Sequence, residues 1–180
     1  LLLNGYTLFL RGEHDPGSFP LTGYPSMGKD EWLRIFMNGK EYGLNHWRFH
    51  SWCPPEAAFA AADEVGIYLQ PELPLFSQNW ENTLVGQDVA RDEFLFSELQ
   101  RLLDTYGNHP SFMFMCMGNE LKGDTTVLKN WVAYGKEYDD RHLYASNANL
   151  EAMGLFLPLE GDEFQVAHAA KVDGKRYERR

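Results

Sequence analysis

Short β-prone runs alternate with amphipathic helical segments along the chain, and this alternation restricts the fold more than any other feature of the 180 residues. We expect strands over residues 6–11, 45–52, 67–70, 112–117 and 143–146, with a sixth candidate over 164–167. We expect helices over residues 30–42, 56–65 and 87–106, and a further helix that begins at Thr125 or Thr126. Repeated strand–helix units predict an α/β fold with a parallel sheet and crossover helices.

The residues around these segments support their ends and their burial. Pro55 and Glu56 favour a helix start, and Gly66 favours a helix end. Residues 112–117 are apolar throughout, which suits a parallel strand that is buried on both faces.

A parallel sheet of this kind is either an open doubly wound sheet or a closed barrel. Residues 11–15, after the first expected strand, do not match the G-x-G-x-x-G phosphate loop, which disfavours a nucleotide-binding sheet. A complete (β/α)8 barrel needs about 250 residues. We therefore expect a truncated (β/α)8 TIM barrel that holds about strands 1 to 5 or 6.

The two ends indicate that residues 1–180 are a partial (β/α)8 barrel. The chain begins at Leu1 without an initiator methionine and ends on the hydrophilic run 175–180. We expect the remaining strands, and any accessory β-sandwich domains, to lie outside this chain.

Charge and cysteine content argue against several classes of function. The chain has 26 acidic and 16 basic side chains, for a formal net charge of −10. This argues against nucleic acid or an anionic membrane surface as the partner. Cys53 and Cys116 lack metal-ligand spacing to another Cys or His, so we expect two buried thiols. No apolar run reaches the ~18 residues of a membrane span.

Polar and aromatic side chains follow each expected strand. In either architecture the functional site lies at the carboxyl ends of the parallel strands, so these side chains should meet at one rim. In chain order they are Glu13, His14, Asp15, Arg48, His50, Ser51, Trp52, Glu72, Asn119, Glu120, Asn147, Asn149 and His168.

Two of these residues have a direct chemical interpretation. Arg48 lies in an otherwise apolar strand, and a buried Arg needs a carboxylate partner, so an acid should face it. Glu120 follows six apolar residues and Gly118, and burial there would keep its carboxyl protonated, as a general acid requires. Of Trp47 and Trp52, we expect one in the core and the other in a position to stack on a ligand.

Several segments resemble a known enzyme family. Met117-Gly118-Asn119-Glu120, at the end of the fourth expected strand, resembles the Asn-Glu signature of clan A glycoside hydrolases. The other matching segments follow the order of glycoside hydrolase family 2 and cover most of the chain. They are residues 4–12, which fit N-G-x-x-x-x-L-R-G, and Leu44-Asn45-His46-Trp47-Arg48, Ala62-Asp63-Glu64-Val65-Gly66-Ile67-Tyr68 and Gly107-Asn108-His109-Pro110-Ser111.

The resemblance implies a retaining β-glycoside hydrolase, similar to β-galactosidases, β-glucuronidases and β-mannosidases, that cleaves β-linked sugars from oligo- or polysaccharides by double displacement. Glu120 would protonate the leaving oxygen and then activate water, and Asn119 would hold the sugar 2-hydroxyl. Arg48 would brace the nucleophile. In the family the nucleophilic Glu belongs to the seventh strand, so we expect it outside this chain and expect the isolated chain to be inactive.

Other rim residues are candidates for substrate binding. The sequence departs from the family at Ser51, where many members carry His, and in residues 13–24, which lack the N-R-H-E pattern. These departures bear on the substrate more than on the reaction. We expect a carbohydrate substrate, neither a metal nor another cofactor, and a secreted or periplasmic parent. The substrate-binding candidates besides Asn119 and Arg48 are His14, Asp15, His50, Trp52, Glu72, Asn147 and His168.

Three alternatives stay open on the sequence. One is a non-catalytic carbohydrate-binding barrel of the same descent. Another is a metal-dependent barrel hydrolase that uses His14, Asp15, His50 and His168, although the first strand lacks an H-x-H pair. The third takes Glu72 and Glu120 as the acid pair, although Glu72 lies in a rigid loop between Pro71 and Pro74, which favours a structural or substrate-binding role.

Overall fold

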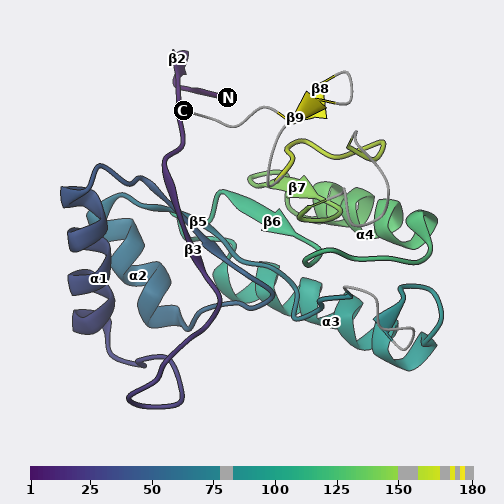
Figure 1. The fold of residues 1–180 in the computed structure, drawn as a ribbon, viewed down its shortest axis with the longest axis horizontal. Helices are drawn as coiled ribbons and strands as arrows, with labels where there is room; N and C mark the ends of the chain where they lie inside the picture. Colours follow the sequence, from purple (N-terminus) through teal and green to yellow (C-terminus); the bar gives the residue numbers. More distant parts are fainter. Residues whose placement is uncertain (78–82, 150–157, 167–170, 173–174, 177–180) are drawn as a thin grey trace.

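The computed structural model describes residues 1–77, 83–149, 158–166, 171–172 and 175–176. Its central strands are parallel and follow one another in sequence order (Figure 1). β3 (Gly12–Asp15), β4 (His46–Phe49) and β5 (Tyr68–Gln70) form one sheet, and β6 (Phe114–Cys116) pairs with β7 (Leu143–Ala145). Isolated parallel bridges from Leu69 to Phe112 and from Glu72 to Cys116 connect β5 with β6. The expected α/β fold with a parallel sheet is confirmed, and the described strands do not close into a barrel.

Four helices alternate with these strands. They are α1 (Lys29–Glu41), α2 (Glu56–Val65), α3 (Val89–Tyr106) and α4 (Thr125–Tyr138). The first three lie within about two residues of the predicted bounds, and the fourth begins where it was expected. α2 begins after Pro55 and ends at Gly66, whose φ of 76° is left-handed, as the sequence predicted. α4 begins at Thr125, as expected, but a threonine that caps this helix, which the sequence also allowed, is wrong: the Asp124 carboxylate accepts the Thr126 N–H at 2.7 Å, so Asp124 is the cap.

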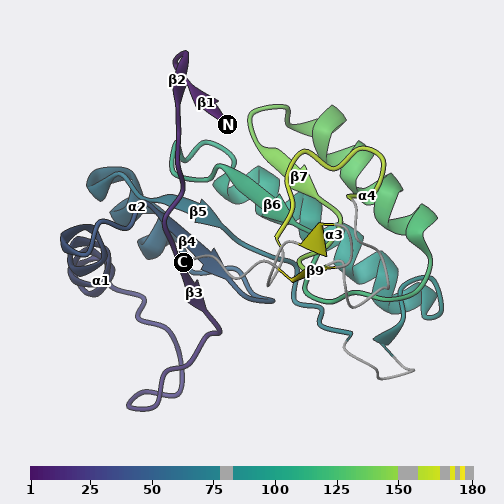
Figure 2. The same ribbon diagram turned by 45° about the horizontal axis from the view of Figure 1, so that its top comes forward.

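The first strand of the parallel sheet is displaced from its predicted position. Residues 6–11 were expected to form it, but the strand that pairs with β4 is Gly12–Asp15, in the register Gly12 to His46. Upstream, β1 (Leu2–Leu3) and β2 (Tyr6–Thr7) form an antiparallel hairpin that projects from the sheet (Figure 2). Tyr6 is 80% exposed and Phe9 is 65% exposed, so this hydrophobic run is not buried as a strand of the sheet would be. His14 and Asp15 therefore lie within the strand and not after it.

The sixth strand candidate forms no extended strand among the described residues. Val166 makes an isolated parallel bridge with Ala148, and Ala167 lies outside the described residues. Further along, β8 (Lys171–Val172) and β9 (Lys175–Arg176) form a short antiparallel pair.

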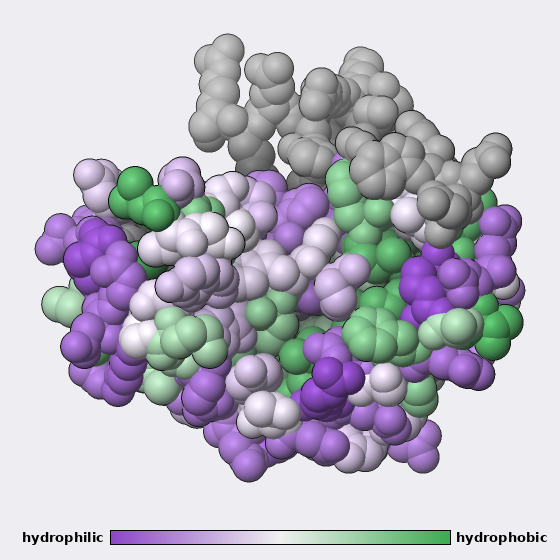
Figure 3. Space-filling view, turned by 90° about the horizontal axis from the view of Figure 1, so that it is seen from below, coloured by the Kyte–Doolittle hydropathy of each residue, from purple (hydrophilic) through white to green (hydrophobic). Residues whose placement is uncertain are grey.

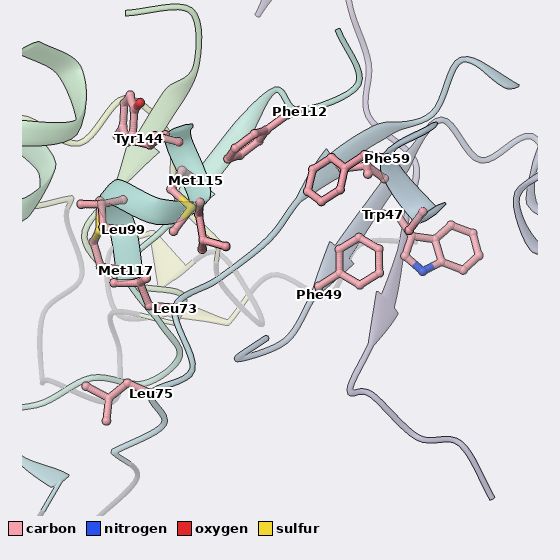
Figure 4. Close-up of a cluster of buried hydrophobic side chains, with 14 of the residues drawn as sticks. Trp47, Phe49, Phe59, Leu73, Leu75, Leu99, Phe112, Met115, Met117 and Tyr144 are labelled. Carbon is pink, nitrogen blue, oxygen red and sulfur yellow. The ribbon is translucent and has the colours of Figure 1, made fainter. Parts of the chain in front are cut away.

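The sheet buries side chains on both faces, and β4 shows how they separate. Trp47 and Phe49 lie on the side of the sheet where Phe59 of α2 packs (Figure 4). Trp47 also packs edge-on against Phe36 of α1, with ring centroids 5.3 Å apart. The intervening residues His46 and Arg48 belong to the opposite face, because successive side chains of a strand alternate. Trp47 is thus the core tryptophan of the pair considered in the sequence.

A smaller apolar cluster lies apart from the main core. It contains Cys116, Ala145 and Ala148, with Phe164 and Val166 packed against it. Both cysteines are free; Cys116 is buried, Cys53 is half-buried, and burial raises the pKa of each thiol. The two thiols expected from the sequence are therefore confirmed, although only Cys116 is fully buried.

On the surface, apolar side chains stand among charged ones, as the face in Figure 3 shows. Among the described helices, none combines the length and apolar character needed to cross a membrane.

Candidate active site

Strained backbone gathers where the parallel strands end. Ser51, Glu120 and Asn149 have φ values of 60°, 50° and 62°, in the left-handed region that side chains other than glycine rarely adopt. They are three of the four non-glycine residues with positive φ in the described part of the chain. Each such residue costs of order 1–3 kcal/mol and persists where the surrounding structure enforces it, often at functional sites.

A cavity of about 430 Å³ opens at this rim. It brings together five of the predicted site residues from three strands: His14, Arg48, His50, Asn119 and Glu120. Its wall also includes Glu13, His46, Phe76 and Asn149, which the sequence did not single out as substrate-binding candidates. Asn149 and Glu13 were among the residues expected at the rim, whereas the sequence carried no signal for Phe76.

Arg48 has the carboxylate partner that its position in the sequence required. Its Nε donates to Oε1 of Glu72 at 2.7 Å, and its NH2 group donates to Oδ1 of Asn119 at 2.8 Å. The side chain of Arg48 is 13% exposed and that of Glu72 is fully buried. One guanidinium thus connects a buried acid with a residue of the cavity wall.

Glu72 is enclosed beneath the cavity. Its second oxygen, Oε2, accepts the Ser51 N–H at 2.8 Å, and the left-handed backbone of Ser51 accompanies this contact. Burial raises the pKa of Glu72, while Arg48 and the Ser51 N–H act in the opposite direction. Both carboxylate oxygens are engaged and the side chain has no exposed surface, which disfavours Glu72 as the second member of a catalytic pair with Glu120.

Glu120 is half-buried at the end of β6. Its N–H donates to the carbonyl of Ala148 at 2.8 Å, and Asn149 Nδ2 donates to its Oε1 at 2.6 Å. Both partners lie on the segment that follows β7. Neighbouring segments therefore fix the backbone and the carboxylate of Glu120 on the cavity wall.

Two histidines lie side by side on the wall formed by β3 and β4. The rings of His14 and His50 are 4.9 Å apart, and His50 packs edge-on against Phe76 at 5.4 Å. Burial, together with the charge of Arg48 and the proximity of His50, lowers the pKa of His14. At neutral pH the His14 imidazole is therefore uncharged and can hydrogen-bond in either direction.

The other predicted site residues do not line this cavity. Asp15 anchors the loop after β3 by accepting the Gly17 N–H at 2.8 Å, and Glu72 lies beneath the site. Asn147 is 1% exposed and uses its amide on the backbone of Leu121, at 2.9 and 3.1 Å. Trp52 is half-buried and lines an adjoining cavity, while His168 lies outside the described residues.

Within the described ranges, no three His, Cys, Asp or Glu side chains converge as a group that could hold a metal ion. The pair His14 and His50 is therefore not completed into a metal site by the described residues. The fourth candidate ligand of the metal-dependent hydrolase, His168, lies outside the described residues.

Comparison with known proteins rests on structure. No family model and no curated protein matches the chain. A solved β-glucuronidase from Parabacteroides merdae is 24% identical with a TM-score of 0.68 over 84% of this chain, and one from Bacteroides uniformis is 19% identical with a TM-score of 0.67 over 82%. A glycosyl hydrolase family 2 member from Bacteroides cellulosilyticus is 22% identical with a TM-score of 0.63 over 79%.

The chain spans about a fifth of the length of these proteins, since each match covers 19% of the solved chain. The described part of the chain therefore has the fold of the corresponding part of two β-glucuronidases and a family 2 glycosyl hydrolase.

Proposed function

We propose that the chain belongs to glycoside hydrolase family 2 and forms part of the (β/α)8 catalytic barrel of a retaining β-glycoside hydrolase. Residues 1–180 would supply about the first five strands, and the remaining strands and any β-sandwich domains would come from the rest of the same polypeptide. The fold shared with solved β-glucuronidases and a family 2 glycosyl hydrolase supports this proposal.

The observation that carries the proposal is the placement of the Asn119–Glu120 pair. Glu120 stands on the wall of a 430 Å³ cavity with its carboxylate held by Asn149, and Asn119 beside it is held by Arg48. A carboxyl group fixed at a cavity wall by hydrogen bonds is the arrangement that general acid–base catalysis requires.

In the proposed mechanism Glu120 acts twice. As the nucleophilic carboxylate attacks the anomeric carbon, Glu120 gives its proton to the glycosidic oxygen and the leaving group departs. Glu120 then takes a proton from water, which attacks the glycosyl-enzyme and releases the sugar with retained configuration. Retention requires two carboxyl groups only ~5–5.5 Å apart, and we propose that the second comes from a later strand of the polypeptide.

Asn119 would hold the sugar. Arg48 fixes the Asn119 amide through its oxygen, so the amide NH2 group is the donor toward the 2-hydroxyl of the bound ring. Arg48, held in turn by Glu72, would act as a positioning residue for Asn119, besides the contact with the nucleophile that the family resemblance implies.

The substrate class that we propose is a β-linked sugar at the end of an oligo- or polysaccharide. His14 and His50 would contribute hydrogen bonds to its hydroxyl groups. The matched proteins named as β-glucuronidases make β-glucuronides part of the panel to be tested, together with β-galactosides, β-glucosides and β-mannosides.

The deciding experiment measures turnover by the full polypeptide that contains this chain. The Glu120→Ala variant should lose most activity on substrates with poor leaving groups, keep more on activated aryl glycosides, and form a β-glycosyl azide when azide is added. Glu41→Ala is the matched control, because Glu41 is an exposed carboxylate at the end of α1 that does not line the cavity. Equal rates for wild type and Glu120→Ala would refute the assignment, and absence of turnover in both would favour a non-catalytic carbohydrate-binding barrel.

A further inference from the structure

A second cavity adjoins the candidate active site, and its walls are aromatic. Its volume is about 460 Å³, and its lining includes Phe19, Tyr24, Trp52 and Phe76. Phe76 and His50 line both this cavity and the one that contains Glu120, so the two cavities share a wall.

The indole ring of Trp52 is held in one orientation. Its Nε1 donates to the carbonyl of Asp15 at 3.0 Å. Phe19 and Phe49 both meet the ring edge-on, with centroids 5.6 and 5.0 Å away and interplanar angles of 83° and 85°. Trp52 therefore presents a fixed surface to the cavity and does not need to be ordered when a ligand binds.

The opposite wall comes from the long loop between β3 and α1, which extends beyond the carboxyl end of β3 (Figure 2). Asp15 and the left-handed Gly17 set the direction of the loop, and the Thr22 hydroxyl donates to the carbonyl of Tyr24 at 2.7 Å. The side chain of Tyr24 remains 63% exposed beside the cavity. Much of this loop belongs to residues 13–24, the segment in which the sequence lacks the N-R-H-E pattern of glycoside hydrolase family 2.

The chemistry of the lining restricts the ligand. Among the described residues, no Asp, Glu, Lys or Arg side chain lines this cavity, so its described wall holds no carboxylate, ammonium or guanidinium group to pair with a charged ligand. Aromatic rings with a few polar groups at one side suit a flat, neutral ring that has apolar faces and a polar edge, which describes a pyranose. The volume is within the range of small-molecule sites.

We propose that this aromatic cavity binds a second sugar ring of a β-linked oligosaccharide, next to the ring held in the cavity of Glu120. The inference rests on the proposed function, because the shared wall at His50 and Phe76 connects the cavity to the bond that would be cleaved. The enzyme would therefore prefer a disaccharide unit over a simple alkyl glycoside.

The test compares variants of the full polypeptide on paired substrates. The substrates are galactose, glucose, mannose or glucuronic acid β-linked to glucose, and the methyl β-glycosides of the same four sugars. Tyr24→Ala should lower the ratio of disaccharide to methyl glycoside kcat/KM about fivefold to tenfold, since one stacked aromatic contact is lost. Phe19→Ala is a second variant with the same expectation. Leu21→Ala is the matched control, because Leu21 is 98% exposed in the same loop and does not line the cavity.

Binding of the disaccharides, followed by the change in tryptophan fluorescence, gives a readout that does not need turnover. If Tyr24→Ala changes neither the ratio nor the affinity more than Leu21→Ala does, the inference is wrong even where Glu120→Ala supports the proposed function. If wild type turns over no glycoside but binds a disaccharide more tightly than Tyr24→Ala does, the proposed catalysis fails while the second-ring site stands. Absence of binding to every disaccharide would overturn the inference.

Discussion

Replacing Arg48 with methionine should destabilise the protein strongly, and the loss should depend on pH. The substitution keeps an apolar side chain of similar length but removes the cation 2.7 Å from the fully buried carboxylate of Glu72. Removal of one partner from a buried ion pair typically costs about 3–5 kcal/mol, because the other charge is left uncompensated. With a slope of about 2 kcal/mol per molar urea, the midpoint of unfolding should fall by about 2 M.

The sign of the pH effect follows from Glu72. Burial already raises the pKa of this carboxyl, and removal of Arg48 takes away the main opposing influence. In the variant, folded Glu72 therefore holds its proton more tightly than the unfolded chain does. Between these two pKa values each unit of rising pH costs about 1.4 kcal/mol, so Arg48→Met should be less destabilised at pH 5 than at pH 8.

The matched comparison is the double variant Arg48→Met/Glu72→Gln. It removes both charges and leaves an amide oxygen that can still accept the Ser51 N–H. We expect it to recover more than half of the lost unfolding free energy and to lose the pH dependence that the raised pKa of Glu72 contributes. Urea titrations at pH 5 and pH 8 of the wild type, Arg48→Met, Glu72→Gln and the double variant complete a double-mutant cycle. A cost of Arg48→Met that is the same at both pH values, or that the double variant does not reduce, would refute the reasoning.

Three further outcomes follow from the structure. Gly39→Ala should lower the free energy of unfolding by about 1–3 kcal/mol, because the added Cβ would lie 2.8 Å from the buried Trp47 ring. Gly28→Ala is the control, because the nearest atom to its Cβ would be 3.6 Å away, and it should not cause this loss. Thermal unfolding of both variants tests the prediction. Burial lowers the pKa of His46 to about 4, so the contribution of His46 to the free energy of unfolding should fall by up to about 3 kcal/mol as the pH drops from 6.5 to 4. His46→Gln should remove this contribution, which urea titrations at successive pH values measure. The isolated 180-residue chain should hydrolyse no aryl β-glycoside, and measurable release of nitrophenol by the purified chain would contradict this.

Local sequence signals were sufficient where a helix end or a buried run was encoded by a few residues. Pro55 and Gly66 delimit α2, and the apolar run 112–117 contains β6, a strand buried along its whole length. The first strand was misplaced because its pairing partner, and not its own hydrophobicity, decides which residues join the sheet. Residues 12–15 are mostly polar, and only their register with β4 makes them a strand.

Five of the residues that line the candidate cavity were predictable from the sequence, but the contacts between them were not. Burial of charge required an acid beside Arg48, but the sequence could not tell which acid, because the choice depends on the register between β4 and β5. Asn149 and Asn147 are two residues apart and equally polar, yet only Asn149 reaches Glu120. The aromatic cavity depends on the path of a long loop, and no periodic pattern in the sequence specifies such a path.

The division of β4 into two faces has a consequence for how this protein can be altered. Trp47 and Phe49 serve the packing against the helices, while Arg48 and His50, between and beyond them, serve the cavity. Substitutions at Trp47 and Phe49 would disturb the packing against the helices. Of the two cavity residues, Arg48 also neutralises the buried carboxylate of Glu72, so substitutions there would change the cavity and the stability together, whereas His50 lies on the cavity wall without that ion pair. The cavity and the fold therefore meet in one residue of this strand, so any evolutionary change at Arg48 would also have to provide a new partner for Glu72.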